Sequence, residues 1–197
     1  MIEVEIKLPL GGQEQEISPD QIVEKLVCLG FSAGSRLKET DIYFDNDADR
    51  IRSRGEALRV RKVETLQDKE KIPKWEADST VFITFKGQKL DHVSMTRREL
   101  ETKVENADIC IELFCAMGYF PVEPKVIKQR QNYHKGNMTA CIDRVENLGN
   151  FLELEIVIPE TEDEDAALRR IEELLCELGY GLKDTIQTSY LSLLQGK

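Results

Sequence analysis

Eight segments of the chain alternate polar and apolar residues with a period of two, which is typical of a β-strand with one buried face. The first, residues 3–7, carries its three charged side chains on one face and Val4 and Ile6 on the other. The other strands are expected over residues 37–44, 58–63, 81–86, 97–104, 125–133, 138–145 and 151–158. Short turns at 134–137 and 147–150 favour antiparallel hairpins.

Three helices are predicted from apolar residues spaced three and four apart. In the first, Ser18 stands at the N-cap, Pro19 and Gln21 follow in the first turn, and Gly30 ends the helix. The other two end at a Gly-Tyr pair, and their apolar stripes are Ile109, Leu113, Phe114 and Met117 in one and Leu168, Ile171, Leu174, Leu175 and Leu178 in the other. We expect the three helices to cover the apolar side of the sheet.

Charged residues on the predicted strands come as like-charged pairs two positions apart, so that both members share a face. The pairs are Arg59 and Arg61, Glu99 and Glu101, Lys128 and Arg130, and Glu153 and Glu155. One interpretation is a sheet with helices on one side and a solvated charged face on the other, the commonest fate of alternating strands. The other is a barrel with these faces inward, where groups of opposite charge offset the repulsion within each pair.

The charged faces supply a basic set and an acidic set. The basic set is Lys7, Arg59, Arg61, Lys86, Lys128 and Arg130, and the acidic set is Glu3, Glu5, Asp143, Glu153 and Glu155. About a dozen inward charges at several kcal/mol each would exceed a total stability of about 5–15 kcal/mol, so an enclosed interior is expected to be an open, hydrated tunnel. Guanidinium and ammonium groups suit phosphate oxygens, while Mg²⁺ or Mn²⁺ joins carboxylates to phosphates. Together the two sets fit a metal-bridged polyphosphate.

Composition narrows the class of protein further. The 197 residues are 41% hydrophobic and 32% charged, as in a globular protein with a real core. The net charge of −10 argues against sequence-independent nucleic-acid binding. Five scattered cysteines and two histidines form neither a disulfide framework nor a zinc motif. No apolar stretch approaches the length of a membrane helix, so a cytoplasmic protein that binds neither membrane nor nucleic acid is expected.

Several motifs follow one another in a fixed order. They are E-x-E-x-K at 3–7, L-R-V-R at 58–61, T-F-K-G at 84–87, R-R-E-L-E at 97–101, K-Q-R at 128–130, I-D at 142–143 and L-G-N-F-L-E-L-E at 148–155. In this order they resemble the CYTH, or triphosphate tunnel metalloenzyme, superfamily over almost the whole chain. The resemblance implies an α+β fold in which eight antiparallel strands close into a β-barrel tunnel with a hydrophilic, charged interior and helices packed outside. We therefore expect a single CYTH-like domain over residues 1–197.

The resemblance also implies a metal-dependent enzyme that acts on a nucleoside, organic or inorganic triphosphate, and the chain looks most like the class IV adenylyl cyclase group. Such an enzyme converts ATP to cyclic AMP and pyrophosphate, or releases phosphate as a triphosphatase, and the sequence leaves both open. In this hypothesis the acidic set holds one or two Mg²⁺ or Mn²⁺ ions, and the basic set binds the triphosphate. Lys7 and Glu101 are the expected catalytic residues, although internal salt bridges explain Glu99 and Glu101 equally well.

Three further expectations concern the arrangement of the site. Glu153 and Glu155 are expected to meet Glu5 across the tunnel at one cation. Ser189 and Tyr190, with Lys183, are candidates for closing one tunnel mouth, although helix capping and packing are the better explanation for them. The protein is expected to be a monomer or a homodimer. The alternative function is a non-catalytic sensor that binds polyphosphate or a nucleotide in the same tunnel.

Overall fold

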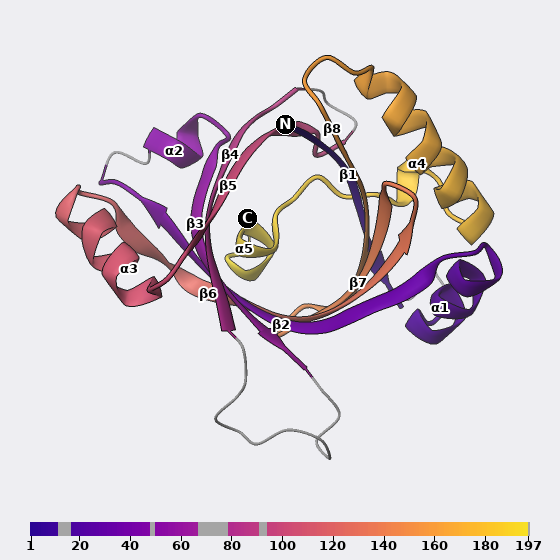
Figure 1. Ribbon diagram of the computed structural model, residues 1–197, viewed down its shortest axis with the longest axis horizontal. Coiled ribbons are helices and arrows are strands. Elements are labelled where there is room, and N and C mark those ends of the chain that lie inside the picture. The colour runs from indigo at the N-terminus through magenta and orange to yellow at the C-terminus, as the bar shows by residue number, and fades with distance from the viewer. Residues whose placement is uncertain (12–16, 48–49, 67–78, 91–93, 197) are drawn as a thin grey trace.

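The wall of the molecule is a closed barrel of eight strands (Figure 1). The computed structural model describes residues 1–11, 17–47, 50–66, 79–90 and 94–196. The strands are β1 (Ile2–Leu10), β2 (Ser32–Asp45), β3 (Ala57–Thr65), β4 (Ser79–Lys89), β5 (Arg97–Val104), β6 (Phe120–Lys135), β7 (Met138–Val145) and β8 (Gly149–Ile158). Their order around the barrel is β1-β5-β4-β3-β2-β6-β7-β8, and all neighbours are antiparallel. The predicted α+β barrel fold is confirmed.

The first and last strands of the chain pair with each other and so close the barrel. β1 and β8 pair along their lengths, from Ile2 opposite Ile158 to Leu10 opposite Asn150. β2 and β6 are longer than predicted, with 14 and 16 residues, and their pairing shifts register twice. Such irregularities bend a strand and increase its twist, which helps long strands to curve around a barrel.

Three helices lie outside the barrel: α1 (Pro19–Cys28), α3 (Ala107–Ala116) and α4 (Glu164–Leu178). α1 begins with the predicted capping box, in which Ser18 Oγ accepts from the backbone N–H of Gln21 while the Gln21 side chain accepts from the N–H of Ser18. α4 ends at Gly179, whose φ of 96° is a left-handed conformation that favours glycine. The shorter helices are α2 (Arg50–Ser53), η2 (Leu182–Asp184) and α5 (Tyr190–Leu194). No helix in the described ranges is long and apolar enough to span a membrane.

The main hydrophobic core lies between the barrel and the pair α1 and α4. Every second residue of β1 and β8 points outward into this core: Val4, Ile6, Leu8, Leu152, Leu154 and Ile156 are all at most 1% exposed. The helices contribute Ile22, Leu26, Ile171, Leu175 and Leu178. Burying each such side chain contributes about 1.5–3 kcal/mol. Because this face of the strands is anchored outside the barrel, the alternating charged face must point inward.

The apolar stripe predicted for α3 is partly wrong. Ile109, Leu113 and Met117 are 52%, 56% and 61% exposed. The buried side of α3 is instead the adjacent row with Cys110 and Phe114, whose ring meets Phe44 edge-on with centroids 5.0 Å apart. The helix is apolar on more than one side, so periodicity alone does not decide which row packs.

The C-terminal helix α5 fills part of one barrel end, where Figure 1 shows it within the ring of strands. Tyr190 and Leu191 of α5 pack with Val126, Val145 and Phe151, which belong to the inward faces of β6, β7 and β8. This second, smaller core is inside the barrel. The expectation of an open, hydrated tunnel is therefore wrong for this part of the interior, where apolar side chains pack together.

Candidate active site

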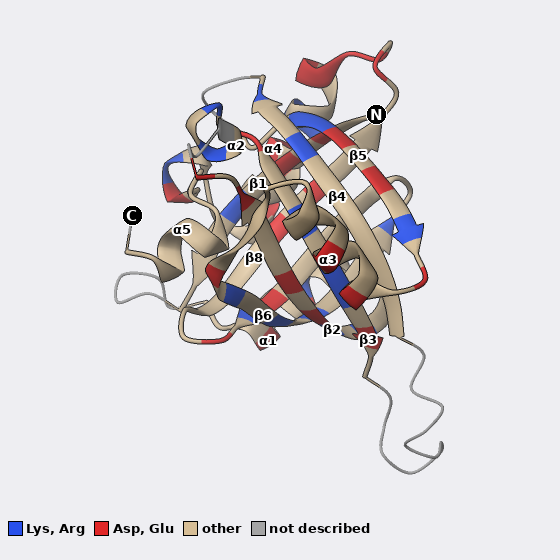
Figure 2. Ribbon diagram, turned by 90° about the vertical axis from the view of Figure 1, so that its left-hand side faces the viewer, with Lys and Arg blue, Asp and Glu red and all other residues tan. Residues whose placement is uncertain are grey.

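A cavity of about 1190 Å³ occupies the remaining interior of the barrel. All six residues of the basic set line it, together with Glu3, Glu5, Glu153 and Glu155 of the acidic set and the predicted catalytic residue Glu101. Figure 2 shows how Lys and Arg (blue) and Asp and Glu (red) recur along the strands. Asp143, the fifth predicted metal ligand, lies behind this lining and is 0% exposed. The alternation of the strands has thus brought the predicted residues to one place.

The first group of ion pairs is centred on Asp41. Arg61 donates from Nε and Nη2 to the two Asp41 carboxylate oxygens at 2.6 and 2.7 Å, and Arg59 Nη1 lies 3.3 Å from Oδ2. Arg61 Nη1 also lies 2.9 Å from Glu39 Oε2. Burial opposes ionisation of Asp41, but Arg61 and Arg59 hold its pKa below the usual range. Two acids of β2 therefore orient the two arginines of β3.

The second group is centred on Asp143. Arg130 donates from Nε and Nη2 to its two oxygens, both at 2.6 Å, and Lys128 Nζ donates to Oδ2 at 2.9 Å. The Tyr190 hydroxyl donates to the same oxygen at 3.1 Å. Arg130 also pairs with Glu153. Asp143 is thus surrounded by cationic and hydroxyl donors.

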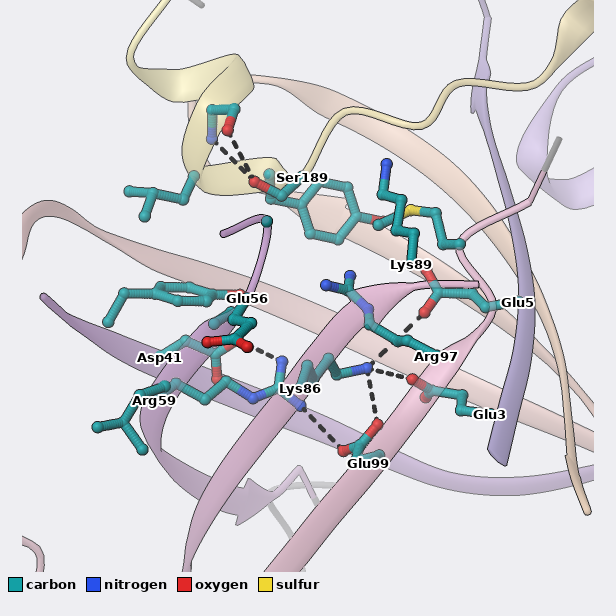
Figure 3. Close-up of a pocket in the computed structure, with 18 of the residues that line it drawn as sticks. Glu3, Glu5, Asp41, Glu56, Arg59, Lys86, Lys89, Arg97, Glu99 and Ser189 are labelled. Atoms are coloured by element: carbon teal, nitrogen blue, oxygen red, sulfur yellow. Dashed lines mark hydrogen bonds and ion pairs between the residues drawn. The ribbon is translucent and has the colours of Figure 1, made fainter. Parts of the chain in front are cut away.

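The third group surrounds Lys7 of β1 and Lys86 of β4. Lys86 Nζ pairs with Glu3, lies 2.8 Å from Glu99 Oε2 and lies 3.8 Å from Glu5 Oε2, as the dashed lines in Figure 3 show. Lys7 Nζ lies 3.2 Å from Glu153 Oε1, 3.7 Å from Glu5 Oε1 and 4.3 Å from the centre of the Tyr190 ring. Each residue of the basic set is thus paired with a carboxylate of the protein.

The pKa values of two carboxyl groups of β8 are shifted in opposite directions. Burial opposes ionisation of Glu153, but Lys7, Arg130 and Lys128 hold its pKa well below the usual range. Burial raises the pKa of Glu155 to about 7; Arg130 counteracts this rise, while the carboxylates of Glu3, Glu5 and Glu153 add to it. Glu155 forms no ion pair with any residue in the described ranges. Glu155 therefore lies beside other carboxylates, and a bound cation would reduce the repulsion between them.

The carboxylates of the acidic set are the kind of ligand that a hard divalent cation prefers, but they do not lie close enough together to hold one. Glu5 and Glu155 are direct cross-strand partners on β1 and β8, and Lys7 stands opposite Glu153 in the same register. Carboxylates are the preferred protein ligands of Mg²⁺ and Mn²⁺. Within the described residues, however, no three acidic, cysteine or histidine side chains are grouped closely enough to hold a metal. Glu5 and Glu155 meet as neighbours in the barrel wall, so the expectation that they meet across the tunnel is wrong.

Several residues of the site were missed from the sequence. Glu39 and Asp41 are an acidic pair two positions apart on a predicted strand, so the rule applied to the other strands would have found them. Arg97 lines the cavity at the start of β5, two residues before Glu99 on the same face. For Tyr190 the signal is weak, because its position depends on how α5 enters the barrel.

The remaining predicted residues lie toward the edges of the site. Glu101 is exposed and accepts a hydrogen bond from Thr84 Oγ1 at 2.9 Å. Ser189 caps α5, because its hydroxyl accepts from the backbone N–H of Ser192 at 3.1 Å, as the capping interpretation predicts. Lys183 is exposed in η2.

Comparisons with known proteins agree with this architecture. The model of the CYTH domain matches residues 1–190. A protein of Methanocaldococcus jannaschii that bears the name "Putative adenylate cyclase" is 35% identical over 193 residues, which cover 98% of each chain.

Solved structures show the same fold. A protein of Pyrococcus horikoshii OT3 is 31% identical and superposes with a TM-score of 0.81 over 98% of each chain. A Hippeastrum protein described as a "putative adenylyl cyclase" with a dominant triphosphatase activity is 16% identical, with a TM-score of 0.60 over 99% of this chain and 95% of its own. At that identity the likeness concerns the fold alone. On the family match and the full-length relative, the chain belongs to the CYTH domain family.

Proposed function

We propose that the protein is a metal-dependent enzyme that binds a triphosphate in the barrel cavity and acts either as an adenylyl cyclase or as a triphosphatase. The observation that carries the proposal is the convergence of six cationic side chains, from β1, β3, β4 and β6, on one cavity that also contains an uncompensated acid. The names of the relatives, one a cyclase and one associated with triphosphatase activity, fit the same pair of reactions.

The basic set binds the phosphate oxygens. Arg59, Arg61 and Arg130 present guanidinium forks that bind phosphate in two-point contacts, while the lysines add compact positive charge. In the structure the carboxylates of Asp41 and Asp143 occupy the forks of Arg61 and Arg130. Phosphate oxygens replace them when the substrate enters, so the acids hold the cations oriented until that moment.

The acidic set holds the metal. Glu5 and Glu155 form its centre, Glu3 and Glu153 lie beside them on the same two strands, and Asp143 is a further predicted ligand. When bound, Mg²⁺ or Mn²⁺ supplies Lewis-acid stabilisation of charge on the phosphate oxygens.

The protein side chains do the remaining work of positioning. Lys7 lies between Glu153 and Glu5, where its ammonium group meets a phosphate oxygen and offsets the charge that develops during transfer. Glu101, at the exposed edge, accepts a proton from the attacking hydroxyl group, which belongs to water in hydrolysis and to the ribose in cyclisation.

Product identification with three substrates tests the proposal. ATP, thiamine triphosphate and tripolyphosphate are incubated with the protein under Mg²⁺ or Mn²⁺; orthophosphate indicates a triphosphatase, and cyclic AMP with pyrophosphate indicates a cyclase. Lys86→Ala should abolish the activity, whereas Lys62→Ala, on the exposed side of β3, should preserve it. Full activity of Lys86→Ala on every substrate refutes the assignment.

Binding without turnover would favour the sensor. Calorimetry with tripolyphosphate and Mg²⁺ distinguishes this case, because a sensor releases heat on binding while product never forms. No heat at all would instead indicate that the charged interior serves the fold alone.

A further inference from the structure

Arg97 differs from every residue of the basic set. It is the first residue of β5, is 7% exposed and lines the cavity, yet its buried Nε has no hydrogen-bond partner. No ion pair joins Arg97 to another residue in the described part of the chain. Figure 3 shows its side chain in the cavity near Lys86 and Lys89, with no dashed line to a neighbour.

An unpaired buried guanidinium is costly. Removing a cation from water costs several kcal/mol unless an anion and hydrogen bonds offset the loss. For Lys86 and Arg59, two members of the basic set, Glu99 and Asp41 supply that anion. For Arg97 the described residues supply none, and its side chain lines the cavity. The missing anion is therefore expected to come from the ligand.

The position of Arg97 indicates which part of the ligand it meets. Arg97 lies two residues from Glu99 along β5, and Glu99 is paired with Lys86, so Arg97 is about 6.6 Å further along the strand than this pair. That distance is longer than the separation of two neighbouring phosphorus atoms in a phosphate chain, so Arg97 and Lys86 meet different phosphates. Arg59 and Arg61 lie on the other side of Lys86 from Arg97, since they stand opposite Thr84 and Phe82 of β4.

We propose that Arg97 binds the outermost phosphate of the triphosphate, while the basic set holds the other two. Arg97 thereby sets the preference for a triphosphate over a diphosphate, which would fill only the positions at the basic set. This inference rests on the proposed function, since it assumes that a phosphate chain lies in the cavity.

The test compares two inorganic anions by titration calorimetry in the presence of EDTA, so that no turnover occurs. Wild-type protein should bind tripolyphosphate more tightly than pyrophosphate. Arg97→Gln should weaken tripolyphosphate binding about 10- to 100-fold, the range for losing a charged hydrogen bond, and leave pyrophosphate binding within about twofold. Arg97→Lys keeps the charge and loses the guanidinium fork, so its affinity for tripolyphosphate should lie between those of wild type and Arg97→Gln.

Arg98→Gln is the matched control. Arg98 is the next residue of β5, is exposed, and pairs with Glu160 at 3.0 Å on the outer surface, so its replacement makes the same charge change outside the cavity. It should bind both anions as wild type does. Equal binding by Arg97→Gln and wild type, or an equal loss for both anions, would overturn the inference while the proposed function stands. A wild-type protein that binds neither anion, both in EDTA and when the titration is repeated with Mg²⁺, would refute the proposed function, and this inference with it.

Thermal unfolding excludes a merely structural role. Because Arg97 has no partner in the described structure, Arg97→Gln without ligand should unfold at the same temperature as wild type or at a higher one. A lower unfolding temperature would show that Arg97 serves the fold, and would overturn the inference.

Discussion

Asp41→Asn tests the idea that acids of the protein hold the guanidinium groups that bind phosphate. Asp41 is 2% exposed and is held by Arg61 at 2.6 and 2.7 Å and by Arg59 at 3.3 Å. Removing one partner of a buried pair costs about 3–5 kcal/mol, and we expect about 3 because Arg61 keeps Glu39 at 2.9 Å. At about 2–4 °C per kcal/mol for a chain of this size, the unfolding temperature should fall by about 6–12 °C.

Tripolyphosphate should reverse this loss. In wild type the phosphate must displace the Asp41 carboxylate, whereas in the variant the guanidinium groups of Arg59 and Arg61 no longer hold that carboxylate. Scanning calorimetry at pH 7 should therefore show a larger rise in unfolding temperature on adding tripolyphosphate to Asp41→Asn than to wild type. Glu64→Gln is the control, because the exposed pair with Lys62 contributes about 0–1 kcal/mol.

The pH dependence gives a second readout of the same variant. The pKa of Asp41 is lowered in the folded protein, so its stabilisation is complete above the unfolded value of about 3.9 and is lost as the pH falls below it. The gap between wild type and Asp41→Asn should therefore narrow in acid. A loss of less than about 1 kcal/mol at pH 7, or an equal ligand effect in both proteins, would refute the reasoning.

Three more predictions concern other parts of the barrel. Tyr190→Phe should lower the unfolding free energy by about 1 kcal/mol in urea titrations, since it loses only the hydrogen bond to Asp143; no change would contradict that bond. Because the pKa of Glu155 is raised to about 7, the metal-free protein should lose stability as pH rises from about 4.5 to 7, and Glu155→Gln should flatten that profile; parallel profiles would contradict it. A single domain over residues 1–197 should unfold in one calorimetric transition, and two separated transitions would exclude it.

The alternation of residues was sufficient to predict the strands and the inward direction of the charges. Val4 and Ile6 face the outer core while Glu5 and Lys7 face the cavity, as a period of two requires. Closure of the barrel did not follow from the pattern, because a charged face is compatible with solvent as well as with an interior. It was the resemblance to a known family that favoured closure.

Other features depend on contacts that a sequence pattern does not contain. Burial of many charges was expected to require a hydrated tunnel, but ion pairs such as Arg130 with Asp143 offset much of that cost. The packing of α5 inside the barrel depends on Tyr190 fitting beneath Lys7 and against Phe151, two contacts between distant parts of the chain. The exposed apolar row of α3 is another example, because the helix has two apolar rows and the sequence pattern does not show which one packs against the barrel.

The pairing of β1 with β8 sets a time order for folding during synthesis. Leu10 pairs with Asn150, so the first strand waits about 140 residues, or roughly 7–30 s at the usual rate of translation, for its main partner. Until then β1 has the shorter pairing with β5, in which Ile2 and Glu3 stand opposite Arg98 and Arg97. Glu5 and Glu155 come together in the same event. Under the proposed function, metal affinity should therefore appear late and abruptly in a nascent chain, and its appearance would report that the barrel has closed.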